Sequence, residues 1–191
     1  VGIDFSSKMI LLAKKKYKET LKKKFISIDI KRYLEDEEEY FDLISANGFF
    51  EYFSFSEMQT LFKKTNKKLN KNGYFVASFR NRLFNIFSLN KFTSNELKLK
   101  NANSLIEESI LLNNSKLSDL IKNKKYHFKN LKKISQPETG GVKVETRHQY
   151  TPIEIIAVLK KYGFTVKNIF PINLHLLNPK IKEKEIIEKL K

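Results

Sequence analysis

Four short apolar segments mark the first eighty residues of the chain. Each is three to six residues long, rich in branched or aromatic side chains, and bounded by polar stretches, as expected for buried strands. The segments cover residues 1–3, 25–30, 41–46 and 74–79. The pattern therefore predicts four strands in this region of the chain.

Helical patterns fill two of the gaps between these segments. A first helix is predicted to begin near Ser7, and a second to cover 56–69 and to end in a left-handed turn at 70–73. The apolar residues expected to face the sheet are Met9, Leu12, Ala13 and Leu21 in the first helix and Met58, Leu61, Phe62 and Leu69 in the second. Because parallel strands need crossover connections, this alternation predicts an α/β fold with a doubly wound, mostly parallel sheet.

The pattern changes after residue 80. Residues 81–149 contain polar helical segments and are too long for a plain loop, so we expect a helical insertion after the fourth strand that covers a substrate pocket. Its clearest helical stretches are 104–113 and 117–124. The α/β pattern returns at 150–191, so residues 1–80 and 150–191 are expected to belong to one domain.

The returning segment begins with a strong helix signal. Thr151, Pro152 and Glu154 form a capping box with proline in the first turn, and the helix is predicted to end at Gly163. The elements expected after it are a strand over 164–170, an apolar segment at 172–177 and a charged helix at 180–191.

Composition limits the classes of function. With 41% hydrophobic and 13% aromatic residues, the 191-residue chain is not intrinsically disordered. The absence of Cys excludes disulfides, thiolate metal sites and cysteine nucleophiles, and agrees with a reducing compartment. No apolar run is long enough to cross a membrane, so we expect a cytoplasmic protein with no membrane partner.

The net charge of +16 raises the question of a nucleic-acid partner. The excess is positive in each of the three regions, and 33 of the 37 basic residues are Lys, whereas Arg is favoured for gripping phosphates and base edges. The run 14–16 is interpreted as a solvated helix face and Arg82 as a solvated charge. We therefore expect a generic basic surface and no nucleic-acid partner.

Polar residues follow the predicted strands. Ligands of doubly wound sheets bind beyond the carboxyl ends of the strands, so these positions carry the chemistry. They are Asp4, Asp29, Asn47 with Gly48, and Arg80 with Asn81. One acid there can accept ribose hydroxyls and a neighbouring one an adenine amine, which suggests an adenosine ligand.

Four motifs occur in order along the chain, at residues 1–9 (VGIDFSSKM), 41–52 (FDLISANGFFEY), 69–78 (LNKNGYFVAS) and 150–164. They resemble, in turn, the second-strand motif, the fourth-strand motif, the turn and fifth strand, and the later helix with its exit into the sixth strand of the class I S-adenosylmethionine-dependent methyltransferases. The resemblance covers roughly 1–80 and 150–175. It implies a domain in which residues 1–80 bind the cofactor.

The resemblance also implies roles for single residues. Asp4 would hold the ribose and Asp29, with the Ile30 backbone, the adenine; the further expected cofactor contacts are Phe5, Ser6, Met9, Asn47 and Gly48. The expected substrate contacts are Arg80, Asn81, His148 and His175. Tyr52 stands where many relatives have a His, so the general base stays open between Tyr52 and His148, and no metal is expected.

The family's first strand and Gly-rich loop are expected upstream of Val1, because the resemblance begins at the second strand. The predicted activity is methyl transfer from S-adenosylmethionine to an oxygen or nitrogen of a small-molecule or sugar-like acceptor. The alternatives are an RNA methyltransferase, favoured by charge, and a non-catalytic binding protein with the same fold. The oligomeric state stays open.

Overall fold

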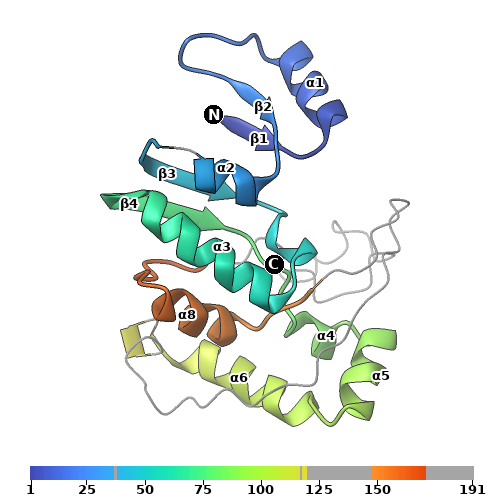
Figure 1. The fold of residues 1–191 in the computed structure, drawn as a ribbon. Helices are drawn as coiled ribbons and strands as arrows, with labels where there is room; N and C mark the ends of the chain where they lie inside the picture. Colours follow the sequence, from blue (N-terminus) through green and yellow to red (C-terminus); the bar gives the residue numbers. More distant parts are fainter. Residues whose placement is uncertain (37, 117, 120–147, 171–191) are drawn as a thin grey trace, which may run out of the picture. The chain divides into compact units, whose positions relative to one another are not determined.

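The computed structural model describes residues 1–36, 38–116, 118–119 and 148–170, shown in colour in Figure 1. The chain divides into two compact units. Unit 1 comprises Val1–Ser45 and Glu57–Val76, and unit 2 comprises Ala46–Ser56 with the described residues after Val76. The expected division at residues 80 and 149 stays a prediction.

The N-terminal region of unit 1 is a strand–helix–strand element. Strands β1 (Gly2–Asp4) and β2 (Phe25–Ser27) pair in parallel, with Gly2 opposite Phe25 and Asp4 opposite Ser27. Helix α1 (Ser7–Lys16) connects them and contacts both strands. Ser6 caps this helix, because its hydroxyl accepts the Met9 N–H at 3.4 Å.

The second strand pair consists of β3 (Phe41–Ala46) and β4 (Leu69–Ala77). Gly73 lies against the Phe41 carbonyl, and the Ser78 N–H donates to the Ala46 carbonyl at 3.2 Å. From the first contact to the second, the residue number rises by five in each strand, so the two strands run in the same direction. The described strands thus form two parallel pairs in an α/β arrangement, and their union in one doubly wound sheet stays a prediction.

Helices α2 (Ile30–Asp36) and α3 (Phe55–Lys68) complete unit 1. The periodicity of α3 produces the expected burial, with Met58, Leu61 and Phe62 inaccessible to solvent. The Phe62 ring contacts Phe75 of β4 edge-on at 6.0 Å between centroids. In Figure 1, α3 lies along β4.

Unit 2 is mainly helical. Its elements are the 3₁₀ turn η1 (Phe50–Tyr52), α4 (Phe84–Phe87), α5 (Lys91–Lys98), α6 (Ala102–Asn114) and α8 (Pro152–Lys161). Phe50, Leu105 and Tyr150 are buried in it. The predicted capping box is confirmed: the Thr151 hydroxyl accepts the Glu154 N–H, and the Glu154 carboxylate accepts the Thr151 N–H. Gly163 ends the segment at a φ of 85°, which glycine tolerates without strain.

The predicted turn at 70–73 is wrong. These residues belong to β4, which begins at Leu69, directly after α3. Gly73 does not adopt a positive φ; a Cβ at this position would lie 2.8 Å from the Phe41 carbonyl oxygen. Glycine is required here because the neighbouring strand approaches closely, not because the chain reverses.

The predicted inner face of the first helix is also wrong. Helix α1 ends at Lys16 and buries Ile10, whereas Met9, Leu12 and Leu21 are exposed. The reason is the narrow support: the strands that α1 contacts, β1 and β2, are three residues long, and of the four predicted residues only Ala13 is half-buried. Met58, Leu61 and Phe62 were predicted correctly because the longer strand β4 lies beneath α3.

The strand predicted over 164–170 is not formed. Phe164 and Val166 are half-buried and Thr165 and Lys167 are exposed, so the alternation is present, but no described strand pairs with them. An extended segment becomes a strand only when a neighbour supplies the backbone partners. The expected elements at 172–177 and 180–191, most of 117–124, and His175 lie outside the described residues. None of the described helices has the length and apolar content needed to cross a membrane.

Candidate functional site

Two carboxylates lie at the ends of the parallel strands of unit 1. Asp4 is the last residue of β1 and pairs with Ser27, the last residue of β2, while Asp29 follows two residues later. The Asp4 carbonyl accepts the Ile28 N–H at 3.0 Å, which continues the ladder to the edge. The pairing therefore brings Asp4 and Asp29 to the same edge of one strand pair, as predicted from their positions directly after the apolar segments.

Each of these acids also shapes the backbone that follows it. Asp4 Oδ1 accepts the Ser6 N–H at 2.7 Å, and Asp29 Oδ1 accepts the N–H groups of Lys31 at 2.8 Å and Arg32 at 3.4 Å. Asp29 thus caps α2, whose first residue is Ile30. From the described residues, Oδ2 of each carboxylate receives no hydrogen bond, so one acceptor oxygen on each remains for the hydroxyl or amine of a ligand.

Three further predicted cofactor contacts, Phe5, Ser6 and Met9, follow Asp4 closely in the sequence. Phe5 is 84% exposed and Met9 is 54% exposed, and Ser6 lies between β1 and α1. An aromatic ring and a thioether, both exposed and within five residues of Asp4 in the sequence, offer apolar surface near a carboxylate. This combination fits a flat heterocycle with an attached sugar.

A second group of predicted residues gathers in unit 2. The Arg80 Nε lies 3.6 Å from Glu51 Oε2, and the N–H of His148 donates to the Glu51 carbonyl at 2.7 Å. Tyr52, the other candidate base, is the neighbour of Glu51 and half-exposed. Residues far apart in sequence thereby converge: Glu51, Tyr52, Arg80 and His148 form one neighbourhood.

The backbone of this neighbourhood is held by a short ladder. The Tyr150 N–H donates to the Arg80 carbonyl at 2.9 Å, and the Arg82 N–H donates to the Tyr150 carbonyl at 3.0 Å. Asn81 lies opposite Tyr150 in this parallel bridge, and its side chain accepts the Leu83 N–H at 3.0 Å. The His148 ring stacks on that of Tyr150 at 6.4 Å.

The remaining pair, Asn47 and Gly48, follows β3. Gly48 has a φ of 60°, open space where a Cβ would be, and an N–H that donates to the Ser78 hydroxyl at 2.7 Å. Asn47 is exposed beside it. The left-handed glycine and its exposed neighbour leave the backbone accessible at this strand end.

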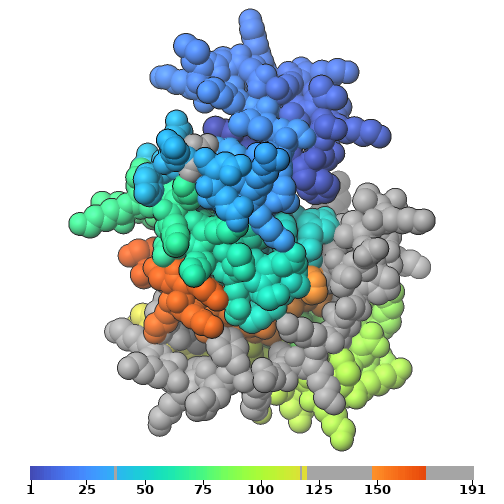
Figure 2. All heavy atoms as spheres, viewed as in Figure 1, coloured from blue at the N-terminus to red at the C-terminus, as the bar shows by residue number. Residues whose placement is uncertain are grey.

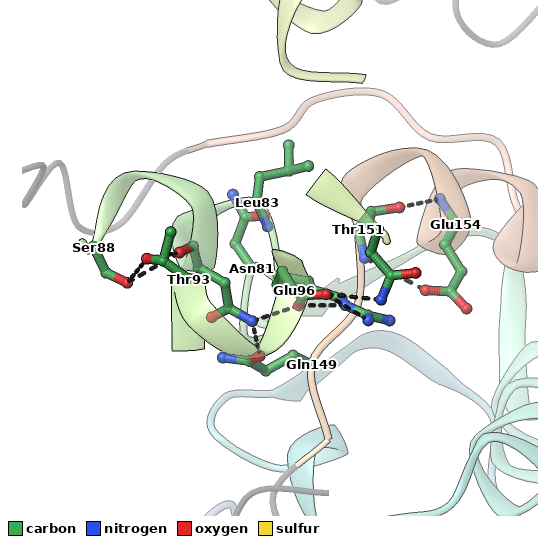
Figure 3. A network of polar contacts seen from close by, with 11 residues as sticks. Asn81, Leu83, Ser88, Thr93, Glu96, Gln149, Thr151 and Glu154 are labelled. Atoms are coloured by element: carbon green, nitrogen blue, oxygen red, sulfur yellow. Dashed lines mark hydrogen bonds and ion pairs between the residues drawn. The ribbon is translucent and has the colours of Figure 1, made fainter. Parts of the chain in front are cut away.

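A buried ion pair supports the ladder, and it corrects the interpretation of Arg82 as a solvated charge. Arg82 is only 4% exposed and binds fully buried Glu96 through two hydrogen bonds of 2.9 Å (Figure 3). Amide groups of Asn85 and Asn101 donate to the same carboxylate at 2.8 and 2.9 Å, and Asn85 also donates to Gln149 at 2.8 Å. Every member of the network has a partner, so burial of the charges is offset.

The electrostatics of Glu96 follow from this geometry. Burial alone would raise the pKa of its carboxyl, but the hydrogen bonds from Arg82, Asn85 and Asn101 and the Arg82 charge outweigh it and lower the pKa. The signal in the sequence was the choice of Arg: only four occur beside 33 Lys, and two of them are Arg80 and Arg82. Arg is the cation suited to a bidentate buried pair.

A further carboxylate joins α6 to the start of α8. Glu108 Oε1 accepts the Ile153 N–H at 2.9 Å. Burial, opposed by this bond and one from Thr151 and assisted by the charge of Glu154, raises the pKa of Glu108. Among the described residues, no three His, Asp or Glu side chains gather as a metal-binding group.

The comparison with known protein families gives a match over the part of the chain that holds Asp4 and Asp29. Residues 1–73 match the family model described as a methyltransferase domain. The matched segment includes Asp4, Asp29, Gly48 and Tyr52 and ends before Arg80. No curated protein and no solved structure matches the chain. The match over residues 1–73 supports a class I methyltransferase domain in the N-terminal part of the chain.

Proposed function

We propose that the protein transfers a methyl group from S-adenosylmethionine to an oxygen or nitrogen of a small-molecule or sugar-like acceptor. One observation carries the proposal: within the matched region, parallel pairing of β1 and β2 brings Asp4 and Asp29 to one edge, each with a carboxylate oxygen left over from its capping role. Two such acceptors suit the ribose hydroxyls and the adenine amine of the cofactor.

The residues of unit 1 would bind the cofactor. Asp4 would accept hydrogen bonds from the ribose hydroxyls, and Asp29 with the Ile30 backbone would hold the adenine. The exposed Phe5 ring and Met9 thioether would cover an apolar face and lose water-accessible area on binding. Asn47 and Gly48, which belong to unit 2, stay cofactor contacts that only the family resemblance implies.

S-adenosylmethionine, when bound, supplies a methyl carbon activated by the adjoining sulfonium. This chain's own residues must hold the acceptor in line, exclude water and, for a hydroxyl acceptor, take its proton. We assign these tasks to the neighbourhood of Arg80 in unit 2. Glu51 orients the Arg80 guanidinium, Asn81 lies at the same ladder, and His148 or Tyr52 takes the proton.

The test is calorimetric titration of the whole chain with S-adenosylhomocysteine, the demethylated product, followed by assays of methyl transfer to a panel of hydroxylated and amino small molecules. We expect saturable binding and turnover of at least one acceptor. Absence of any binding up to about 1 mM, an affinity of only about −4 kcal/mol, would contradict the proposal.

His148→Gln and Tyr52→Phe separate the two candidate bases. The variant that lacks the true base is expected to turn over about 10²–10⁴-fold more slowly than the wild type and to keep the wild-type affinity for the cofactor. The other variant serves as the matched control, because it removes a neighbouring polar group without removing the proton acceptor.

A further inference from the structure

Residues 14–24, which we call the basic hairpin, run from the last turn of α1 towards β2 and concentrate positive charge. They contain seven Lys and one Glu, a net +6, whereas the other residues of 1–80 have nine basic against ten acidic side chains, a net −1. The excess charge of the first eighty residues is therefore a property of eleven residues. Figure 2 shows the long side chains of this blue segment projecting from the surface.

The tip of the basic hairpin is apolar. Thr20 and Lys23 exchange two backbone hydrogen bonds of 3.0 and 3.1 Å, which close a turn with Leu21 and Lys22 at its end. Leu21 is 97% exposed. A turn tip is normally polar, because an exposed aliphatic side chain contributes nothing to the fold. An aliphatic side chain surrounded by cations therefore points to an external partner with negative charge and an apolar interior.

The single acid of the segment is used internally. Glu19 Oε1 accepts the Phe25 N–H at 2.9 Å, and its other oxygen lies 3.2 Å from Lys14 Nζ. The hydrogen bond from Phe25 lowers the pKa of this exposed carboxyl. Glu19 thus ties the start of β2 to the hairpin, while most of the lysine charge stays directed to solvent.

The ring of Tyr17 braces the base of the hairpin. The ammonium groups of Lys16 and Lys23 lie 5.3 and 5.8 Å from its centroid, and the Phe25 ring is 6.4 Å away in a tilted arrangement. These contacts hold Lys16 and Lys23 on either end of the segment against one aromatic ring. The cations are therefore presented by a braced element and not by a free tail.

We propose that the basic hairpin binds an anionic lipid surface, with the lysines among the headgroups and Leu21 inserted at the interface. Lys is a compact, hydrated charge that suits the diffuse field of such a surface, where contributions of neighbouring cations add. One leucine cannot anchor a protein by itself, so the attachment is reversible and depends on salt. This replaces the expectation of no membrane partner, and it does not depend on the proposed methyl transfer.

Nucleic acid fits the same segment less well. The basic hairpin has no Arg for bidentate phosphate contacts, its tip is aliphatic and cannot stack on a base, and its Tyr17 ring is flanked by two ammonium groups. The anionic lipid surface is therefore the partner whose chemistry matches both the lysines and Leu21.

The test is co-sedimentation of the full chain with vesicles of phosphatidylcholine containing about 30% phosphatidylserine, compared with pure phosphatidylcholine, at roughly 0.1 M and 0.5 M salt. We expect binding to the anionic vesicles at the lower salt and little binding to the neutral ones. The triple variant Lys22→Gln, Lys23→Gln, Lys24→Gln should weaken partitioning by about tenfold or more. Leu21→Ser should weaken it by a few-fold without changing the charge.

The matched control removes three exposed lysines elsewhere in unit 1: Lys63→Gln, Lys67→Gln, Lys71→Gln. Since the loss of net charge is identical, the control should keep nearly full binding if the hairpin is the contact. Equal weakening by both triple variants would overturn the proposal in favour of non-specific attraction. Absence of vesicle binding would also overturn it, as would tight binding of single-stranded RNA that the hairpin triple variant abolishes.

Discussion

Four donor groups converge on the carboxylate of Glu96, whose side chain is fully buried. Two come from Arg82 and one each from Asn85 and Asn101. A buried ion pair adds little net stability compared with apolar packing, but removal of one partner strands the other as an uncompensated charge. At the residue scale, the described core of unit 2 is therefore most sensitive at this pair.

We expect Glu96→Gln to lower the free energy of unfolding of unit 2 by about 3–5 kcal/mol, because it leaves the Arg82 guanidinium buried without a counter-charge. Denaturant unfolding followed by circular dichroism measures this change. The matched control is Glu57→Gln, which breaks the exposed 2.7 Å pair with Lys31 and should cost no more than about 1 kcal/mol. Equal decreases in the free energy of unfolding of the two variants would show that the buried pair contributes no more to stability than the exposed one.

The loss of stability caused by Glu96→Gln is expected to depend on pH. The pKa of Glu96 is lowered in the folded protein, so the ionised form adds stability above the ordinary carboxyl pKa, and this stability is lost as pH falls through the folded value. The difference in stability between wild type and Glu96→Gln should therefore shrink on acidification below about pH 4. A constant difference down to the acid limit would contradict this assignment.

Asp4 is the residue on which the proposed cofactor site depends most. We expect Asp4→Ala to weaken binding of S-adenosylhomocysteine by about 1.5–3 kcal/mol, through loss of charge-assisted hydrogen bonds to the ribose. Calorimetry of the folded variant provides the measurement. Asp36→Ala, which removes an exposed carboxylate at the end of α2 in the same unit, should leave the affinity unchanged. Unchanged affinity in Asp4→Ala would remove Asp4 from the site.

At the scale of elements, the contact between α6 and α8 is made by a carboxylate that is costly to ionise. Glu108 accepts the Ile153 N–H in the first turn of α8, where the Thr151 and Glu154 side chains also meet the backbone. Positive N-terminal N–H groups favour a negative partner, but burial and the nearby Glu154 oppose it. The pKa of Glu108 is raised because burial and the Glu154 charge outweigh the hydrogen bonds that favour the ionised form.

We expect Glu108→Gln to be at least as stable as wild type near neutral pH, because the amide oxygen still accepts the Ile153 N–H without the cost of a buried charge. A group with a raised folded pKa contributes stability below its unfolded pKa that is lost as pH rises through the folded value. The advantage of the variant should therefore vanish on acidification, as thermal unfolding at several pH values would reveal. Glu107→Gln, at an exposed neighbouring position, is the control. A clear loss of stability at neutral pH would show that the ionised carboxylate is required.

At the scale of the whole molecule, the two units are expected to open separately. Glu96 belongs to unit 2, as do the ladder amides of Arg82 and Tyr150, whereas the core of α3 around Phe62 belongs to unit 1. Cooperative opening would make all amides of one unit exchange together. The units therefore provide a direct comparison within one sample.

In a hydrogen-exchange experiment, Glu96→Gln should accelerate the amides of Arg82, Leu105 and Tyr150 by one common factor and leave that of Phe62 unchanged. The described segment of the insertion contains the buried Glu96 and Leu105, so in the wild type we expect these amides to be protected despite the polar sequence around them. Equal acceleration of Phe62 would mean that the two units unfold as one.

Local patterns in the sequence were sufficient for the elements and for the acids at the strand ends. Strand β3, the burial of Met58, Leu61 and Phe62, and the capping box of α8 depend on neighbours within a few residues, so periodicity and cap chemistry predict them. The positions of Asp4 and Asp29 follow from strand ends for the same reason. The family resemblance, now supported over residues 1–73, rests on these local motifs.

Tertiary structure decided everything that depends on a distant partner. Arg82 lies inside because Glu96, Asn85 and Asn101 surround it, and His148 joins Tyr52 because its backbone pairs with Glu51. The stripe of α1 that is buried, the close approach at Gly73 and the missing strand after α8 each depend on which neighbour is present and how wide it is. Periodicity indicates which side chains share one face of a helix or strand. Only tertiary packing supplies the surface, the counter-charge or the neighbouring strand that covers that face.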